Sequence, residues 1–211
     1  MSAEPGETPP LADFYGLLGE LLSFPGPDLA RAVQSGDVRG AVEHILGHLP
    51  LGDALAPLDA LGPMDLEPQD LESEYIRIFD VPDGPPTPLY TGVYASRRRD
   101  AMEELLRIYR HFGLTIESSA HDLPDFVPTV LEFLRFLTFG QDAGEPAARP
   151  AFESARADIL ERHLRPWAEQ TAKRMAERSA HPFYQSIVIV LNDVVGADLV
   201  ALGRAGAGHS G

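Results

Sequence analysis

The segment from residue 181 to residue 191 reads HPFYQSIVIVL, and it decides the fold class of the chain. Its second half, Ser186–Leu191, is rich in β-branched residues and could form a strand if it were taken alone. No other part of the sequence offers a partner strand, and Pro182 stands where proline is favoured, at the first position of a helix. We therefore expect a helix from about residue 181 to Leu202 and an all-α protein.

Helical periodicity covers most of the remaining chain. Phe14, Leu17, Leu18, Leu21 and Leu22 follow the i, i+3, i+4, i+7 spacing of an amphipathic helix. Further helices are expected over residues 29–49 with a break at 36–40, 70–79, 96–112, 122–139, and 151–179 with a kink at Pro166. Asp28, Ser96 and Asp122 are the expected N-caps, and Gly113 is the expected C-terminal glycine. The prediction is a single-domain helical bundle over residues 11–203, with a proline-rich loop at 80–94 and disordered tails at 1–10 and 204–211.

The composition excludes several classes of function. The 211 residues contain no cysteine and carry a formal net charge of −15, of which residues 1–70 contribute −10. Such a field repels nucleic acid and anionic lipid and attracts cationic peptides. The N-terminal ten residues contain two glutamates and three prolines, unlike a signal peptide, and the longest apolar run considered, Ile187–Leu191, is far shorter than a membrane span. We expect no membrane insertion, no nucleic-acid partner and a location in the compartment of synthesis.

Motifs of catalysis are missing from the sequence. It contains neither a phosphate-binding loop, nor a nucleophile elbow, nor a zinc-protease helix motif. His44 and His48 are four residues apart and could share a helix face, but no third ligand stands in a recognisable position, so a structural role is favoured. We expect a protein that is not an enzyme and that binds no metal or cofactor of its own.

Two segments stand out from the helical background. The first is LESEYIRIFDVPDGPPTPLY, residues 71–90, and the second is DLPDFVPTVLEFLRFL, residues 122–137; a helix ending in IYRHFGL separates them. Four prolines prevent residues 80–94 from forming a helix, while Leu89, Tyr90, Val93 and Tyr94 give this loop large side chains that can anchor it on a surface.

The ordered set resembles the TorD/DmsD/NarJ family of redox-enzyme maturation chaperones. That family has an acidic-Tyr-x-x-Leu-Phe helix, a proline-rich loop ending near Pro-Tyr, a helix closing in Tyr-x-x-x-Gly-Leu and a Leu-Pro-Asp-His segment followed by Leu-Glu-Phe. The stretch GELLSFPGPDL, residues 19–29, is also similar to the opening of the NarJ branch. This chain departs from the pattern at Ile78, where the family has Leu, and at Phe126, where the family has His.

The resemblance implies an all-helical cytoplasmic chaperone. Its expected partners are the catalytic subunit of a molybdenum enzyme of the dimethyl-sulfoxide-reductase type, the N-terminal leader of that subunit, often a twin-arginine signal, and proteins of molybdenum-cofactor biosynthesis. Such a chaperone holds its client open until the molybdopterin cofactor is inserted, and works as a monomer or a homodimer. Two alternatives remain open: a helical adaptor retained in a mature complex, and a nucleotide-hydrolysing helper, for which no phosphate loop is present.

The candidate peptide-binding residues follow from the same motifs. A twin-arginine leader presents two guanidiniums and an apolar helix-forming stretch, which carboxylates beside an apolar groove would complement. We expect Phe79 and Tyr90 to face each other across this groove, with Asp125 near its rim. The full candidate set is Glu72, Glu74, Tyr75, Phe79, Pro86, Pro88, Leu89, Tyr90, Pro124, Asp125 and Phe126.

Several of these residues also have a plainer interpretation. Tyr75 and Phe79 share a helix face and could belong to the core. Glu72 and Glu74 could be a solvated first turn, and Asp125 could help to cap its helix. The run Arg97–Arg99 is unfavourable at a helix N-terminus, which points to carboxylate partners or an anionic ligand, although an exposed surface is favoured.

Overall fold

The computed structural model describes residues 8–49, 58–65, 67–81, 84–116 and 123–208. Within these ranges the regular elements are helices, and the only β feature is one isolated bridge. The α-helices are α1 (Pro10–Leu21), α2 (Pro27–Ser35), α3 (Asp37–Leu46), α4 (Pro68–Phe79), α5 (Arg98–His111), α6 (Val127–Ala143), α7 (Arg149–Ile159), α8 (Arg165–Glu177) and α9 (Pro182–Gly208). Two 3₁₀ turns, η1 (Asp59–Leu61) and η2 (Thr91–Tyr94), and a π-helical turn, η3 (Leu160–Leu164), complete the fold. The predicted all-α class is confirmed.

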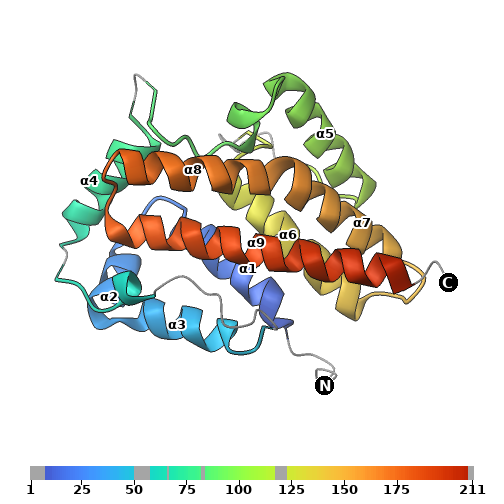
Figure 1. Ribbon diagram of the computed structural model, residues 1–211, viewed down its shortest axis with the longest axis horizontal. Coiled ribbons are helices and arrows are strands. Elements are labelled where there is room, and N and C mark those ends of the chain that lie inside the picture. Colours follow the sequence, from blue (N-terminus) through green and yellow to red (C-terminus); the bar gives the residue numbers. More distant parts are fainter. Residues whose placement is uncertain (1–7, 50–57, 66, 82–83, 117–122, 209–211) are drawn as a thin grey trace.

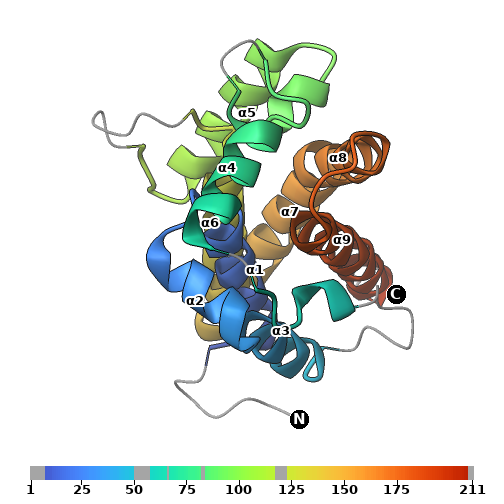
Figure 2. The ribbon, with the colours of Figure 1, turned by 90° about the vertical axis from the view of Figure 1, so that its left-hand side faces the viewer.

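The helices pack in pairs around one core. Helix α1 packs along α6, α6 packs against α7, and α8 packs against α9. Figure 1 shows α7 and α8 as one long rod crossing the molecule with α9 beside it, and Figure 2 shows α5 and the α2–α3 pair at opposite sides. The largest fully buried side chains include Trp167, Tyr15, Tyr184, Phe14 and Phe183, which come from α1, α8 and α9.

The rod formed by α7 and α8 is interrupted as the sequence predicts. Pro166 cannot donate a backbone hydrogen bond, and its ring crowds the carbonyl one turn earlier, so a regular α-helix cannot pass through it undisturbed. The π-helical turn Leu160–Leu164, which ends two residues before the proline, accommodates it. This turn places Leu160, His163 and Leu164 in the interior.

Helix α9 confirms the assignment of the Ser186–Leu191 segment as helix and corrects its end. The helix begins at Pro182, as predicted, and continues to Gly208, so residues 204–208 are helical rather than part of a tail. Its residues Pro182–Gly203, with a mean hydropathy of 1.8, are long and apolar enough to cross a membrane by length and composition alone, although the uninterrupted apolar run Ile187–Leu191 is far shorter. In this fold 44% of the 18-residue stretch with this hydropathy is buried. The core helices of soluble proteins can have the same length and composition.

Several predicted helix starts are wrong by a few residues. Proline takes the place of the expected side-chain caps: α2 begins at Pro27 after Gly26, so Asp28 lies in the first turn, where a negative charge is favourable. Helix α5 follows Arg97 rather than Ser96, and α6 begins only at Val127. Gly113 is confirmed as the C-terminal glycine of α5 by its φ of 76°, and Gly36, with a φ of 83°, makes the predicted break between α2 and α3. The proposed cap Asp122 and residues 1–7 lie outside the described ranges.

Candidate functional site

The two motif segments, distant in sequence, lie against each other. Tyr90 and Phe126 form an antiparallel bridge, in which the Thr91 N–H donates to the Asp125 carbonyl at 2.8 Å and the Val127 N–H donates to the Leu89 carbonyl at 2.9 Å. The ring centroids of Tyr90 and Phe126 are 5.5 Å apart. The end of the proline-rich loop is therefore fixed to the start of α6.

The middle of the loop is fixed to α4 and α8. Thr87 is buried, and both its N–H and its hydroxyl donate to the carbonyl of Ile78, at 3.1 and 2.8 Å. The indole Nε1–H of Trp167 donates to the carbonyl of Pro88 at 2.8 Å, and Arg174 donates to that of Pro86 at 3.4 Å. Pro86 and Pro88 thus hold the loop in place through their carbonyl groups, and their rings are half-buried.

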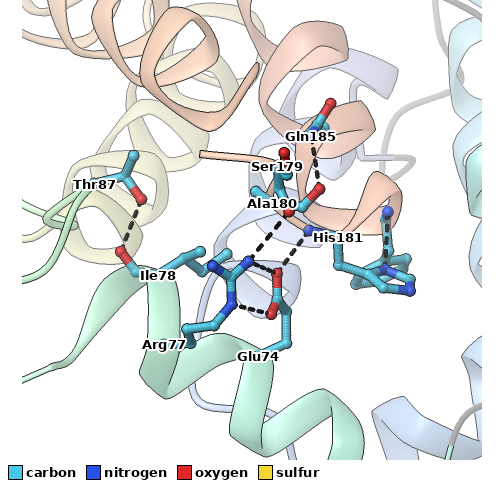
Figure 3. Close-up of polar contacts among 9 residues, drawn as sticks. Glu74, Arg77, Ile78, Thr87, Ser179, Ala180, His181 and Gln185 are labelled. Carbon is cyan, nitrogen blue, oxygen red and sulfur yellow. Dashed lines mark hydrogen bonds and ion pairs between the residues drawn. The ribbon is translucent and has the colours of Figure 1, made fainter. Parts of the chain in front are cut away.

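Glu74 clamps the turn between α8 and α9 (Figure 3). Its carboxylate accepts two hydrogen bonds from Arg77, at 2.6 and 2.7 Å, and one from the backbone N–H of His181 at 2.6 Å. Arg77 also donates to the carbonyl of Ser179, a residue with a φ of 49°. Burial alone would raise the pKa of Glu74, but the hydrogen bonds from Arg77 and His181 hold the pKa below its usual value. Glu74 therefore fixes the start of α9 through the N–H of His181. The nearby Glu72, on the same helix, is half-buried.

Tyr75 and Phe79 belong to the core, which is the plainer of their two interpretations. They are 5% and 3% exposed, and both rings pack edge-on against Tyr184 of α9. The Tyr75 hydroxyl donates to the carbonyl of Leu22 at 3.3 Å. The expected pairing of Phe79 with Tyr90 across a groove is corrected by these contacts: Phe79 packs edge-on against Tyr184 of α9, and Tyr90 packs against Phe126.

Asp125 is buried rather than placed at a rim, and it caps no helix. Its carboxylate is fully buried, and Oδ2 accepts a hydrogen bond from Nε of Arg98 at 3.1 Å. The Arg98 guanidinium carbon lies 5.0 Å from the centre of the Tyr90 ring. The residue before it, Pro124, accepts a hydrogen bond from the Tyr109 hydroxyl at 2.9 Å, and burial raises the pKa of that hydroxyl. Within the arginine run, Arg98 thus has a carboxylate partner, one of the possibilities raised by its position, whereas Arg97 and Arg99 are exposed, as was favoured.

An open apolar groove of about 550 Å³ lies next to this junction. It is formed by the end of α5 and the residues after it, by the first turns of α6 and by Ser23 beyond α1. Its walls are Ser23, Tyr109, Leu114, Thr115, Ile116, Phe126, Pro128, Thr129, Glu132, Phe133 and Phe136. Among these described residues Glu132 is the one that carries a charge. The groove therefore combines aromatic walls with a carboxylate.

The sequence predicted one residue of this groove, Phe126, and missed the others. A signal was present for Phe136, because it does not belong to the stripe Val127, Val130, Leu131, Leu134 and Leu137 that buries α6, whereas Phe133 is itself buried. Phe136 is 36% exposed, and Leu114, in the family motif at the end of α5, is 38% exposed. Surplus apolar side chains on the outer face of a helix indicate a binding surface.

The described part of the chain contains no group of three or more His, Asp or Glu side chains that could hold a metal ion. His44 and His48 lie together on α3 and just after it, with ring centroids 4.8 Å apart, and Nδ1 of His48 is hydrogen-bonded to the carbonyl of His44 at 2.7 Å.

Comparison with known proteins identifies relatives of one kind. A family model described as nitrate reductase delta subunit matches residues 47–173. The perchlorate reductase assembly chaperone protein of Dechloromonas aromatica (strain RCB) is 31% identical over 136 residues, 62% of this chain and 61% of the relative. The chlorate reductase assembly chaperone protein of Ideonella dechloratans is 35% identical over 78% of this chain and 76% of the relative. The corresponding selenate reductase protein of Thauera selenatis is 34% identical over 55% and 63%.

The matches to the perchlorate and selenate reductase proteins each span less than two thirds of the relative's length. Among solved structures, a putative redox enzyme maturation protein from Archaeoglobus fulgidus aligns over 95% of this chain and 97% of its own, with a TM-score of 0.50 and 19% sequence identity. That likeness concerns the fold.

Proposed function

Because this chain belongs to the nitrate reductase delta subunit family, within the TorD/NarJ group of redox-enzyme maturation chaperones, we propose that it assembles the catalytic subunit of a molybdenum-containing oxidoreductase. In this proposal it binds the N-terminal leader of that subunit in the cytoplasm. It keeps the subunit open until the molybdenum cofactor is inserted. The names of the relatives, assembly chaperones for perchlorate, chlorate and selenate reductases, support this class of client.

The observation that carries the proposal is the groove between α5 and α6. Its aromatic walls suit the apolar face of a helical peptide, the usual mode by which a groove recognises an amphipathic segment. The chain around it carries a net charge of −15, which attracts a leader that begins with arginines and accelerates its association. The loop, held at Pro88 and at Tyr90, supports the groove through the Tyr90–Phe126 contact, so little conformational entropy is lost when a peptide binds.

The first prediction tests the groove with two phenylalanines of the same helix. Phe136 lines the groove, whereas Phe139, 47% exposed one turn further along α6, does not. Phe136→Ser should weaken binding of a client leader peptide about tenfold or more, because it removes an aromatic wall, and Phe139→Ser should leave the affinity within about twofold. Titration calorimetry measures both. Equal affinities for the two variants would place the peptide elsewhere on the protein.

A second function, a subunit retained in the mature enzyme, is favoured by the description of the matching family as a delta subunit. Co-purification from cells that make the reductase separates the two. A chaperone should be recovered with the cofactor-free precursor and be absent from the finished enzyme. Recovery at a fixed ratio in the active oxidoreductase would instead establish the subunit and rule out the chaperone.

A further inference from the structure

One oxygen of the buried Asp125 carboxylate, beside the groove, makes no hydrogen bond within the described part of the chain. Oδ2 is hydrogen-bonded to Arg98, but Oδ1 makes no hydrogen bond to any residue that the structure describes. A buried carboxylate can accept several hydrogen bonds, and leaving part of that capacity unused costs free energy. The carboxylate therefore has unused capacity to accept a further hydrogen bond.

Arg98 engages this carboxylate incompletely. Its bond to Asp125 uses Nε alone, although an arginine aligned with a carboxylate can donate two parallel N–H bonds. Its side chain is 42% exposed while that of Asp125 is 0% exposed, so Arg98 lies between the carboxylate and solvent. A single bond made by a half-exposed side chain is one that another guanidinium can replace.

The carboxylate is connected to the groove through two aromatic rings. The Arg98 guanidinium lies over Tyr90, Tyr90 packs on Phe126, and Phe126 is part of the groove wall. Gly92 makes the approach possible, since a Cβ there would lie 2.7 Å from Oδ2 of Asp125 and 2.9 Å from Cγ of Arg98. A peptide whose apolar part fills the groove would thus bring a flanking arginine close to Tyr90 and Asp125.

We propose that Arg98 occupies, in the unbound chaperone, the position that an arginine of the client leader takes in the complex. The leader displaces Arg98, stacks its guanidinium on Tyr90 and bonds both oxygens of Asp125, while its apolar face lies in the groove. Arg98 thereby makes binding selective, because a peptide without an arginine at this place cannot displace Arg98 from Asp125. This inference rests on the proposed function and adds to it a competing internal ligand.

The second prediction uses a matched pair of substitutions and two synthetic peptides. One peptide has two consecutive arginines followed by an apolar helix-forming stretch, and the other has glutamines in their place. Arg98→Gln should bind the arginine peptide about tenfold more tightly than the wild type, because the competitor is gone. Arg99→Gln is the control, because this substitution removes the same charge from a side chain that is 89% exposed and pairs with Glu103. It should leave the affinity near the wild-type value, and neither variant should bind the glutamine peptide more tightly.

Further variants keep the result decisive. Asp125→Asn in the Arg98→Gln background should abolish the gain, and Arg98→Lys, which keeps the charge but not the planar fork, should give a smaller gain. Weaker binding of both peptides by Arg98→Gln, or equal gains in Arg98→Gln and Arg99→Gln, would overturn the displacement. A wild-type protein that binds neither peptide would refute the proposed function itself, whereas wild-type binding with no effect of Arg98 would refute the displacement alone.

Discussion

At the scale of single residues, Tyr75 belongs to an aromatic cluster that joins three parts of the fold. Its ring packs against Phe24 after α1, Phe79 of α4 and Tyr184 of α9, and its hydroxyl donates to Leu22. The family motif that contains Glu74, Tyr75 and Phe79 therefore joins α4 to α9. This role explains the motif without any contact to a peptide.

The third prediction follows from that cluster. Tyr75→Ala should lower the free energy of unfolding by about 3–5 kcal/mol, the usual cost of deleting a buried aromatic side chain. Tyr75→Phe, which keeps the ring and removes the hydroxyl that bonds the Leu22 carbonyl, should cost about 1 kcal/mol. Denaturant unfolding measures both. An unchanged midpoint for Tyr75→Ala together with lost peptide binding would return the residue to the binding site.

The fourth prediction compares two glycines. A Cβ at Gly92 would lie 2.7 Å from Asp125, whereas a Cβ at Gly196, within α9, would meet no atom within 4 Å. Gly92→Ala should lower the melting temperature, because Asp125 or Arg98 must move, and Gly196→Ala should raise stability by about 0.5–1 kcal/mol through helix propensity. Thermal melting of the two variants gives opposite signs, and two shifts of the same sign would contradict the geometry.

At the scale of elements, apolar periodicity predicted the helices well because each helix must bury one stripe. The break at Gly36 and the interruption of the helix before Pro166 also followed from local chemistry. Contacts between distant segments could not be predicted in this way. Nothing in residues 71–90 indicates that Glu74 accepts a hydrogen bond from the N–H of His181 or that Trp167 donates one to the carbonyl of Pro88. Of the candidate residues chosen from the motifs, Phe126 lines the groove, whereas others, such as Glu74, hold the fold together.

The π-helical turn before Pro166 holds a buried histidine, and this gives the fifth prediction. Burial lowers the pKa of His163 below its usual 6.5, and Arg162 lowers it further, although Glu104, Asp125 and Asp158 oppose the shift. The folded state therefore resists protonation at His163. As the pH falls through about 6.5, the unfolded chain takes up this proton more readily, and the free energy of unfolding should decrease.

His163→Gln should remove this part of the pH dependence. The difference between unfolding midpoints at pH 7.5 and pH 5.5 should be smaller in His163→Gln than in the wild type. His44→Gln, at an exposed position on α3, is the control and should retain the wild-type difference. A steeper dependence after His163→Gln would mean that Glu104 stabilises the charged imidazole, the opposite sign of linkage.

At the scale of the whole molecule, charge is distributed unevenly over the fold. Residues 1–70 carry −10 of the total −15, whereas α5 and the residue before it, 97–111, hold five arginines against three acids. Helices α2 and α3 lie on the side of the molecule opposite α5 (Figures 1 and 2). A cationic peptide approaching the protein is therefore drawn by a net negative field, while the arginines of α5 repel it locally.

This asymmetry leads to the last prediction, which concerns rates. Raising the ionic strength from about 0.05 to 0.5 M shortens the Debye length to a few ångströms and screens the long-range attraction, so the association rate of an arginine-bearing leader should fall about tenfold or more. The dissociation rate should change much less, because it depends on the desolvated contacts within the groove. Stopped-flow fluorescence at several salt concentrations measures both rates. The glutamine peptide should show a nearly flat association rate. If the arginine peptide were equally insensitive to salt, recognition would rest on the apolar groove alone, and the acidic surface would serve solubility rather than selection of the client.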